Sequence, residues 1–368
     1  MTASKNHVTI SANETLHYSE REEVMASYKD IVKMTGLSLG TVSNVVQGKG
    51  SVKPENREKV VNAMKELGYR VDYQARSLAS DKTDLIGLIV SDIENVAETK
   101  FMMPMETFAE KNHCRIITAT SRNDSEREKR NCESMLSSKV DGLFIFFESL
   151  ANEEYFRMLA RTEKTPIIFL ARYLEGCDLP YVGVDNFYAA KCMVDFVYSR
   201  GHRSITYLDI IEGAMLSPNR DRRNSVEAEC KARGMEFRLL EYPDKRDDIT
   251  VGYDAAEELI LSGKLPKMVF PRDDSFAVGF YNACLRHGIH VPEDVSIMGF
   301  GDFYSARITP KRISTFDRKF DQVIETATQL YLKIRRARRN GEDESELKKK
   351  IFVKGSIIEG ETVAFVKE

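Results

Sequence analysis

The sequence predicts an α/β protein with a small all-α head and a two-lobed body built on parallel sheets. Two observations carry this prediction. A block near the start has the spacing of three short helices, and the rest alternates apolar strands with helices in two similar halves. The chain has 368 residues, more than one domain usually holds, and its 42% hydrophobic content is enough for several cores.

The predicted head covers residues 27–71. Ser27 and Asp30 form a capping-box-like pair at the start of the first helix. Gly36 ends that helix, because a reversal at positive φ favours glycine. Ser38 caps a second helix, and Pro54 lies in the first turn of a third. Apolar side chains at helical spacing are expected to face inward: Ile31, Val32, Met34, Val42, Val45, Val46, Val60, Val61, Met64 and Leu67.

The tight glycine turn and the short polar second helix are typical of a helix-turn-helix. Ser38, Thr41, Ser43 and Asn44 can donate to phosphates or reach base edges of double-stranded DNA. Free N–H groups at the start of the second helix favour a phosphate. The alternative is an ordinary three-helix bundle with a polar face.

The charge distribution also favours a DNA-binding head. The net charge is −3, which alone argues against a nucleic-acid partner. Residues 27–83 nevertheless hold seven Lys and three Arg against six acidic residues, an excess of four positive charges. The remainder therefore carries −7, and only the head is suited to touch phosphate.

The start of the chain and the cysteine pattern bound the compartment and the chemistry. Residues 1–26 are polar and are expected to be a disordered extension, with Met25 as an alternative translation start. We find neither an apolar signal core nor an apolar run of 18 residues, so we expect a cytoplasmic protein with no membrane partner. Six cysteines are scattered without metal-ligand spacing, so we expect no metal site, no disulfide framework and no cofactor.

The body begins at residue 84. Near-continuous apolar strands alternating with helices indicate parallel sheets covered on both faces. The pattern restarts after residues 182–186, which gives two halves with a ligand crevice at the strand ends. The sequence has no GxGxxG, P-loop or HExxH motif, which disfavours an enzyme. The expected strands are 85–90, 114–120, 141–147, 166–170, 204–208, 267–271, 295–300 and 351–358.

The head resembles the DNA-binding end of the lactose-repressor (LacI/GalR) family. The resemblance rests on the turn at Gly36 and on residues 41–46, 57–60 and 67–69. It adds Leu39 and Gly40 to the expected DNA contacts. It also implies that residues 72–83 are a hinge helix and linker, in which Leu78, with Ala79 beside it, enters the minor groove and kinks the duplex. Asn44 stands where many members have arginine.

The body resembles the same family through short matches along nearly its whole length, at residues 184–186, 201–203, 273–279, 291–296, 299–300 and 314–315. The resemblance implies the fold of periplasmic sugar-binding proteins, with three crossings of the chain between lobes. The expected first lobe is residues 84–185 and 317–340. The expected second lobe is residues 186–316 and 341–368.

The same resemblance suggests which residues bind a small effector. Arg222 suits bidentate contact with diols or a carboxylate, and Asp274 accepts from ligand hydroxyls. Arg172 and Asp185 are further candidates, and Phe101 is a candidate to stack on a sugar ring. Each has a structural alternative: a surface arginine, a helix cap or a core aromatic residue. Asp273 replaces the usual asparagine and adds negative charge at the crevice.

We therefore predict a ligand-responsive transcriptional regulator without enzymatic activity. The favoured form is a repressor of a carbohydrate or small-metabolite operon. It would bind a palindromic operator as a homodimer and respond to a sugar or sugar derivative. Two alternatives share the two-lobed fold. A solute-binding protein predicts a secretory signal and no head, and a sugar-processing enzyme predicts a nucleophile or an acid–base pair in the crevice.

Overall fold

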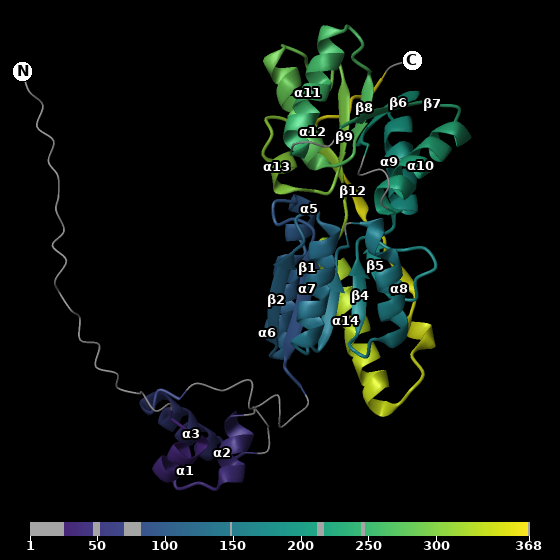
Figure 1. Cartoon of the computed structure of the whole chain (residues 1–368). Coiled ribbons are helices and arrows are strands. Elements are labelled where there is room, and N and C mark those ends of the chain that lie inside the picture. The colour runs from purple at the N-terminus through teal and green to yellow at the C-terminus, as the bar shows by residue number, and fades with distance from the viewer. Residues whose placement is uncertain are drawn as a thin grey trace, which may run out of the picture. The chain divides into compact units, whose positions relative to one another are not determined.

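The computed structural model describes residues 26–46, 52–69, 82–147, 149–211, 217–243 and 247–366. The chain divides into two compact units, Met1–Asp81 and Lys82–Glu368, here called the head and the body (Figure 1). Most of the predicted extension and hinge, with Leu78 and Ala79, lies outside the described residues.

The head contains the three predicted helices, α1 (Tyr28–Thr35), α2 (Leu39–Val46) and α3 (Pro54–Glu66). Gly36 ends α1 with a φ of 69°, so the glycine turn is confirmed. The prediction of an inward-facing side chain is wrong for two residues: Met34 is 47% exposed and Val61 is 39% exposed. The buried core of the head is Ile31, Val42, Val45, Val46, Val60 and Ala63.

The first lobe of the body is a six-stranded, all-parallel sheet in the order β11-β5-β4-β3-β1-β2. Helices α6 and α14 pack on one face and α7 and α8 on the other. The strands are β1 (Leu85–Val90), β2 (Arg115–Thr120), β3 (Gly142–Ile145), β4 (Ile167–Leu170), β5 (Tyr181–Val184) and β11 (Lys350–Val353). The helices are α5 (Val96–Thr99), α6 (Met102–Asn112), α7 (Ser125–Ser137), α8 (Glu153–Thr162) and α14 (Phe320–Asn340), with short 3-10 turns η1 (Leu150–Asn152) and η3 (Ser345–Leu347).

Alternation along the strands explains the two covered faces. Ile86, Leu88 and Val90 of β1 join the core under α6 and α14, whereas Leu85 and Ile89 join the core under α7 and α8. Successive strand side chains point to opposite faces, so a strand that is apolar at both kinds of position must lie between two helical layers.

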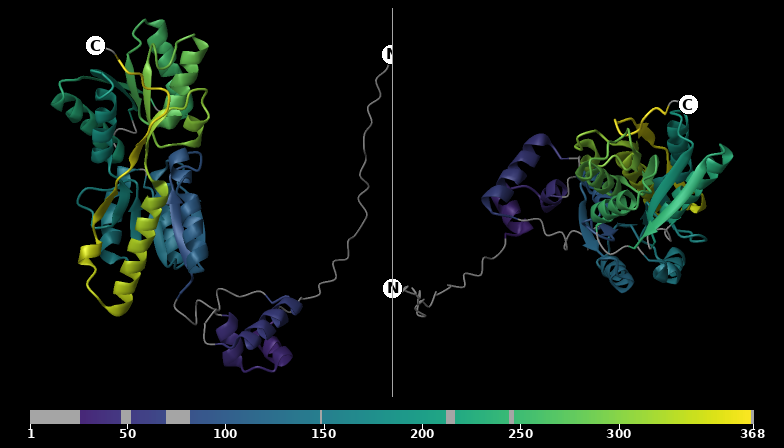
Figure 2. Two further views of the ribbon diagram at one scale, coloured as in Figure 1. Left: turned by 180° about the vertical axis from the view of Figure 1, so that it is seen from behind. Right: turned by 90° about the horizontal axis from the view of Figure 1, so that it is seen from above.

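The second lobe repeats this plan, with a sheet between layers of helices (Figure 2). Its strand order is β12-β10-β9-β8-β6-β7, parallel except for the antiparallel pair β10 and β12. Helices α9 and α10 cover one face and α11 and α12 the other. The strands are β6 (Ser204–Ile210), β7 (Glu236–Tyr242), β8 (Met268–Pro271), β9 (Ser296–Phe300), β10 (Ser314–Asp317) and β12 (Ser356–Ile358). The helices are α9 (Asn186–Tyr198), α10 (Ser217–Ala232), α11 (Asp248–Leu261), α12 (Asp274–Arg286) and α13 (Tyr304–Arg307).

The end of the chain corrects the predicted lobe boundary. The single strand expected at 351–358 in the second lobe is two strands: β11 pairs with β5 in the first lobe, and β12 pairs with β10 in the second. The chain crosses between lobes at Gly355, where a Cβ atom would collide with the Asp317 carbonyl oxygen and the Phe316 ring. Residues 341–353, which were expected in the second lobe, therefore belong to the first lobe. Every helix in the described residues is too short or too polar to cross a lipid bilayer.

Candidate functional site

The start of α2 presents the predicted DNA-contacting residues away from the head core. The Ser38 hydroxyl accepts from the Thr41 N–H at 3.1 Å and shares a hydrogen bond with the Thr41 hydroxyl at 2.9 Å. Ser38 therefore caps α2, as predicted. Leu39 is 58% exposed, and Gly40 is exposed beside it. The other predicted contacts on this face are half-buried: Thr41, Ser43 and Asn44.

The inward face of α2 fixes which side remains available. Val42 is fully buried, and Val45 and Val46 are 6% and 9% exposed. These residues recur at helical spacing, so they anchor one stripe of α2 on α1 and α3. The polar stripe of α2 faces away from these two helices, which is the arrangement a recognition helix needs.

In the body, a hollow with an empty volume of about 550 Å³, including space open to solvent, lies between the two lobes. Its walls follow the carboxyl ends of β1, β3 and β4 in one lobe, and of β8 and β9 together with the start of α10 in the other. Ligands in open α/β sheets bind at this edge. The lining residues are Asn95, Ala97, Glu98, Phe101, Phe146, Ala171, Arg172, Pro218, Asn219, Arg222, Arg272, Asp273, Phe300 and Arg318.

Arg222 lies in this pocket, as the sequence predicted, and is only 4% exposed. Its Nε donates to the Tyr207 hydroxyl at 3.1 Å, and its Nη1 donates to Asn186 Oδ1 at 3.0 Å. Its Nη2 donates to Asn219 Oδ1 at 3.2 Å and to the Arg272 carbonyl at 2.9 Å. These four hydrogen bonds hold the guanidinium group in one orientation. All four acceptors are neutral, so they do not compensate its positive charge.

Arg172 also lines the pocket and is tied to a buried carboxylate. Its Nη2 lies 3.3 Å from Glu98 Oε1, and its Nη1 donates to the Phe147 carbonyl at 2.9 Å. Glu98 in turn accepts from the Ser91 N–H at 2.6 Å and from the Ser91 hydroxyl. Glu98 was not predicted from the sequence. A glutamate in a short helix gives no sequence signal. Its partner Arg172 is far away in the sequence, and only the folded chain brings the two side chains together.

The two adjacent aspartates after β8 face different surroundings. Asp273 lines the pocket and caps α12, because its Oδ1 accepts from the Phe276 N–H at 3.0 Å. Asp274 is fully buried and does not line the pocket. Its carboxylate accepts from the Thr315 hydroxyl at 2.6 Å and from the Phe303 N–H at 2.7 Å. This geometry does not support the expected ligand contact of Asp274, and it points to Asp273 instead.

The other two candidates have structural roles in this geometry. Asp185 lies outside the pocket lining and caps α9 by accepting from the Tyr188 N–H at 2.9 Å. Phe101 reaches the pocket lining but is only 2% exposed. Its ring lies 4.8 Å from both Phe146 and Phe320, centroid to centroid. Phe101 is therefore part of an aromatic floor, and little of its face is open for stacking.

Two further arginines line the pocket that the sequence did not indicate. Arg272 directly follows β8, and Arg318 lies where the chain passes from β10 to α14. Burial opposes the charge of Arg272, but Asp248 and Asp273 raise its pKa above the usual value. Burial, with repulsion from Arg222, instead lowers the pKa of Arg318 to about 10. Neither residue belongs to a motif, so only the folded arrangement reveals them.

One hydrogen bond joins the lobes beside the pocket. The Tyr173 hydroxyl in the first lobe donates to Asp221 Oδ2 of α10 at 2.5 Å. Tyr173 is 7% exposed and Asp221 is 8% exposed. Burial, followed by this hydrogen bond, raises the pKa of Tyr173, so the phenol keeps its proton and remains the donor. We call this pair the inter-lobe latch.

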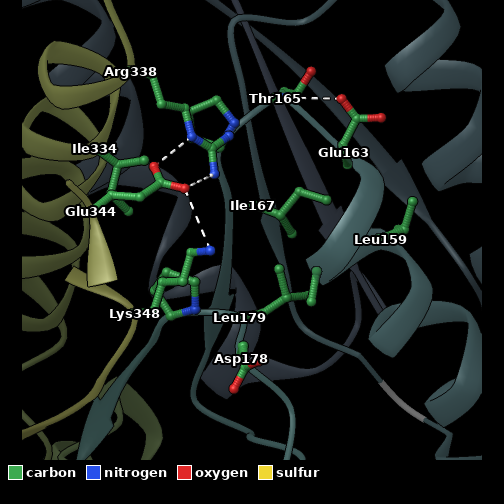
Figure 3. A pocket seen from close by; sticks show the side chains of 13 residues that line it. Leu159, Glu163, Thr165, Ile167, Asp178, Leu179, Ile334, Arg338, Glu344 and Lys348 are labelled. Atoms are coloured by element: carbon green, nitrogen blue, oxygen red, sulfur yellow. Dashed lines mark hydrogen bonds and ion pairs between the residues drawn. The ribbon is translucent and has the colours of Figure 1, made fainter. Parts of the chain in front are cut away.

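A second hollow, with an empty volume of about 340 Å³, lies in the first lobe at the amino ends of β4 and β5 (Figure 3). Its charged groups pair with one another: Glu344 lies 2.6 Å from Arg338 and 3.5 Å from Lys348, oxygen to nitrogen. The wall opposite them is apolar, with Leu159, Ile167 and Leu179. Since these three charges already have partners, the inter-lobe pocket is the stronger ligand site.

Comparison with known proteins decides the family. A model described as bacterial regulatory proteins of the lacI family matches residues 27–72, and a periplasmic binding protein-like domain matches residues 194–363. The chain belongs to the LacI family. The two matches fall on the head and on the body, so this LacI-family chain is a ligand-responsive, DNA-binding transcriptional regulator, and the predicted family and fold class are confirmed.

Relatives of this LacI-family chain have similar lengths. Catabolite control protein A of Priestia megaterium is 28% identical over 302 residues, covering 79% of this chain and 87% of the relative. The ribose operon repressor of Haemophilus influenzae is 28% identical over 304 residues, covering 79% of this chain and 86% of the relative. The lac repressor dimer bound to operator and the anti-inducer ONPF shares the fold, with a TM-score of 0.78 at 20% identity over 92% of this chain and 99% of that one.

Proposed function

We propose that this regulator represses an operon for the use of a carbohydrate or small metabolite. In this proposal it binds a palindromic operator as a homodimer, and a sugar or sugar derivative changes its affinity for that operator. One observation carries the proposal: the pocket of a DNA-binding chain takes its walls from both lobes and from the crossover at Arg318. A ligand held there contacts both lobes and one of the connections between them.

The proposed mechanism is a shift between lobe arrangements. A ligand that contacts Arg172 in one lobe and Arg222 in the other favours whichever arrangement brings them to the right separation. Ligand can shift that equilibrium only by its difference in affinity for the two states. A coupling of about 1–3 kcal/mol would change operator affinity by about 5–150-fold. A dimer would carry this change to two heads on the halves of one palindrome.

The pocket favours binding over catalysis. Its two lining carboxylates both have structural partners: Glu98 is paired with Arg172, and Asp273 caps α12. Acid–base catalysis needs carboxyl groups that are free to exchange protons with a substrate. The curated relatives are also regulators, which disfavours the sugar-processing alternative. A solute-binding protein would have no use for the helix-turn-helix head.

A mobility-shift experiment tests the proposal. The full-length protein is mixed with DNA from around its own gene, chosen for an inverted repeat, and with a scrambled duplex of the same composition. We expect preference for the inverted repeat and a stoichiometry of two chains per site. The measurement is then repeated across a panel of sugars and small metabolites, where one class should raise or lower the affinity.

A matched pair of variants gives the control. Arg222→Met should remove the response to the active metabolite and leave operator binding without metabolite unchanged. The exposed Arg161 lies outside the pocket lining, so Arg161→Met should preserve both properties. Equal binding to palindrome and scrambled DNA under every condition would refute the proposed function.

A further inference from the structure

The inter-lobe pocket holds more positive than negative charge. Four arginines line it against two carboxylates, Glu98 and Asp273. Sugar hydroxyls need only neutral or singly charged hydrogen-bond partners, so an excess of guanidinium groups in a half-enclosed site requires a separate explanation. Charge without a partner in a low-dielectric site is costly, and proteins keep it where a ligand supplies the partner.

Two of the four arginines are compensated within the protein. Arg172 forms an ion pair with Glu98 at 3.3 Å. Arg272 lies close enough to Asp248, Asp273 and Asp209 for their charges to raise its pKa despite burial. These two guanidinium groups therefore have anionic neighbours, and they do not by themselves call for an anionic ligand.

Arg222 and Arg318 are compensated less. Asp273 raises the pKa of Arg318, but burial and repulsion from Arg222 outweigh it. Arg222 donates to neutral oxygens. Within the described residues no carboxylate lies within ion-pair distance of either guanidinium. The Nε of Arg318 is shut off from solvent and has no hydrogen-bond partner in the described part of the chain. A buried donor without a partner is rare and indicates a missing acceptor.

The same two guanidinium groups both approach one aromatic ring. Their central carbons are 4.0 Å and 5.3 Å from the centroid of the Phe300 ring, for Arg222 and Arg318 respectively. They can therefore be no farther apart than those two distances added together. The ring attracts both cations, but it carries no net charge to neutralise them. Burial, and then repulsion from Arg222, lowers the pKa of Arg318 to about 10, so the group stays protonated at neutral pH.

We propose that the effector carries a phosphate monoester, which binds to Arg222 and Arg318 beside the Phe300 ring in the pocket wall. This inference rests on the proposed function and specifies its ligand class as a phosphorylated sugar or polyol. A phosphate monoester carries about two negative charges at neutral pH, which matches two guanidinium groups that form no ion pair within the described residues. Arginine also offers paired N–H groups that suit phosphate oxygens. A carboxylate would neutralise only one of the two charges.

The position of Arg318 links this ligand class to regulation. Arg222 belongs to α10 of the second lobe, whereas Arg318 lies on the segment that connects β10 of the second lobe to α14 of the first. An anion that holds both would pull that connection toward α10. The phosphate would then stabilise one lobe arrangement, and the uncharged part of the ligand would contact the first-lobe wall near Arg172.

The first experiment measures binding of inorganic phosphate to the full-length protein without DNA, by calorimetry and by thermal unfolding. Sodium chloride of equal ionic strength is the reference. We expect phosphate to raise the unfolding temperature above that reference. Arg318→Met should weaken phosphate binding by about tenfold or more, because charge-assisted hydrogen bonds are lost. Arg318→Lys should restore part of it, and the exposed Arg161→Met should bind like the unaltered protein.

The second experiment compares ligand pairs: glucose 6-phosphate with glucose, ribose 5-phosphate with ribose, and gluconate as a carboxylate. We expect the phosphorylated member of at least one pair to bind about tenfold or more tightly than its neutral parent. Phosphate binding that equals the chloride reference, or that survives Arg318→Met, overturns the inference. Tighter binding of a neutral sugar or of gluconate also overturns it.

Operator binding is followed in the same samples to separate this inference from the proposed function. Preference for the palindrome together with no phosphate binding refutes the ligand class alone. Loss of that preference in the unaltered protein refutes the proposed function. Thermal unfolding of Arg318→Met without phosphate verifies that the variant is folded.

Discussion

At the scale of single residues, two neighbouring aspartates show how one peptide step separates a pocket residue from a core residue. The Asp273 carboxylate lies at the pocket and caps α12. The Asp274 carboxylate lies in the core of the second lobe, between Thr315 and the backbone of Phe303. A Cβ atom at Gly299 would collide with it, which explains the glycine at that position of β9. Asp274 therefore positions β10 and the loop after β9.

The buried carboxyl of Asp274 should make the stability of the body depend on pH. Burial raises its pKa from 3.8 to about 7, although its hydrogen bonds from Thr315 and Phe303 oppose the rise. Between those values the folded state holds a proton that the unfolded state has released. The free energy of unfolding should therefore fall as pH rises from about 4 to 7, by up to ~4 kcal/mol. Asp274→Asn should flatten this dependence, as measured by urea unfolding at a series of pH values.

The control for this prediction is Asp254→Asn, the same substitution at a half-buried aspartate of α11. Asp274→Asn should also lower stability at acid pH, since an amide cannot accept both hydrogen bonds. An unchanged pH slope in Asp274→Asn would show that other groups dominate the titration.

The sequence predicted single pocket residues where they belong to a motif and missed them elsewhere. Arg222 was indicated by the family resemblance, and the structure places it in the pocket. Arg318 has no motif and follows a strand that was not predicted, so nothing in the sequence pointed to it. Asp274 was assigned in place of Asp273, because sequence position does not tell which of two adjacent side chains turns inward at a helix start.

At the scale of elements, the start of α2 combines two roles that can be separated. Ser38 caps the helix through the Thr41 N–H, and it lies exposed where a phosphate would approach. An aspartate caps a helix as well as a serine does, but its charge repels phosphate. Capping and DNA contact therefore respond differently to substitution at this position.

Ser38→Asp should leave the stability of the head within about 0.5 kcal/mol and lower operator affinity by about tenfold or more. Ser38→Ala should instead lower head stability by about 1 kcal/mol through loss of the cap. Thermal unfolding and mobility shifts on the same preparations measure the two effects. Unchanged operator affinity in Ser38→Asp would place this helix start away from the phosphates.

Elements were predicted best where their apolar pattern was continuous. β1, β4, β8 and β9 are buried along their lengths and were all expected. β7 was missed, because it is an edge strand whose residues alternate between exposed and half-buried, with charges among them. The strand expected at 351–358 was divided wrongly, since a crossing between sheets at Gly355 leaves no break in the apolar pattern.

At the scale of the whole molecule, the latch between Tyr173 and Asp221 is a direct polar link between the two lobes. Hydrogen bonds to charged groups contribute about 1.5–3 kcal/mol. Tyr173→Phe should lower the free energy of unfolding of the body by about that amount and should change the affinity for effector, because the lobes lose a restraint. Calorimetry with the active metabolite measures the second effect.

A matched substitution separates the latch from general damage to the first lobe. The Tyr155 hydroxyl has no hydrogen-bond partner among the described residues, so Tyr155→Phe should change neither stability nor effector affinity by much. If Tyr173→Phe alters stability but leaves effector affinity and the operator response as they were, the latch supports the fold and does not take part in regulation.

The uneven charge of the chain determines how the whole protein should meet DNA. Residues 27–83 carry an excess of four positive charges and the remainder carries −7, so only the head end can gain from phosphate contact while the body is repelled. Each phosphate that the protein neutralises releases counterions and adds about 0.9 to the slope of log affinity against log salt.

Operator affinity should therefore fall steeply with salt, and twice as steeply for a dimer as for one head. Mobility shifts from low to moderate salt measure this slope, with scrambled duplex giving the nonspecific value. A flat dependence would mean that the head does not dock through phosphates, whatever its helices resemble.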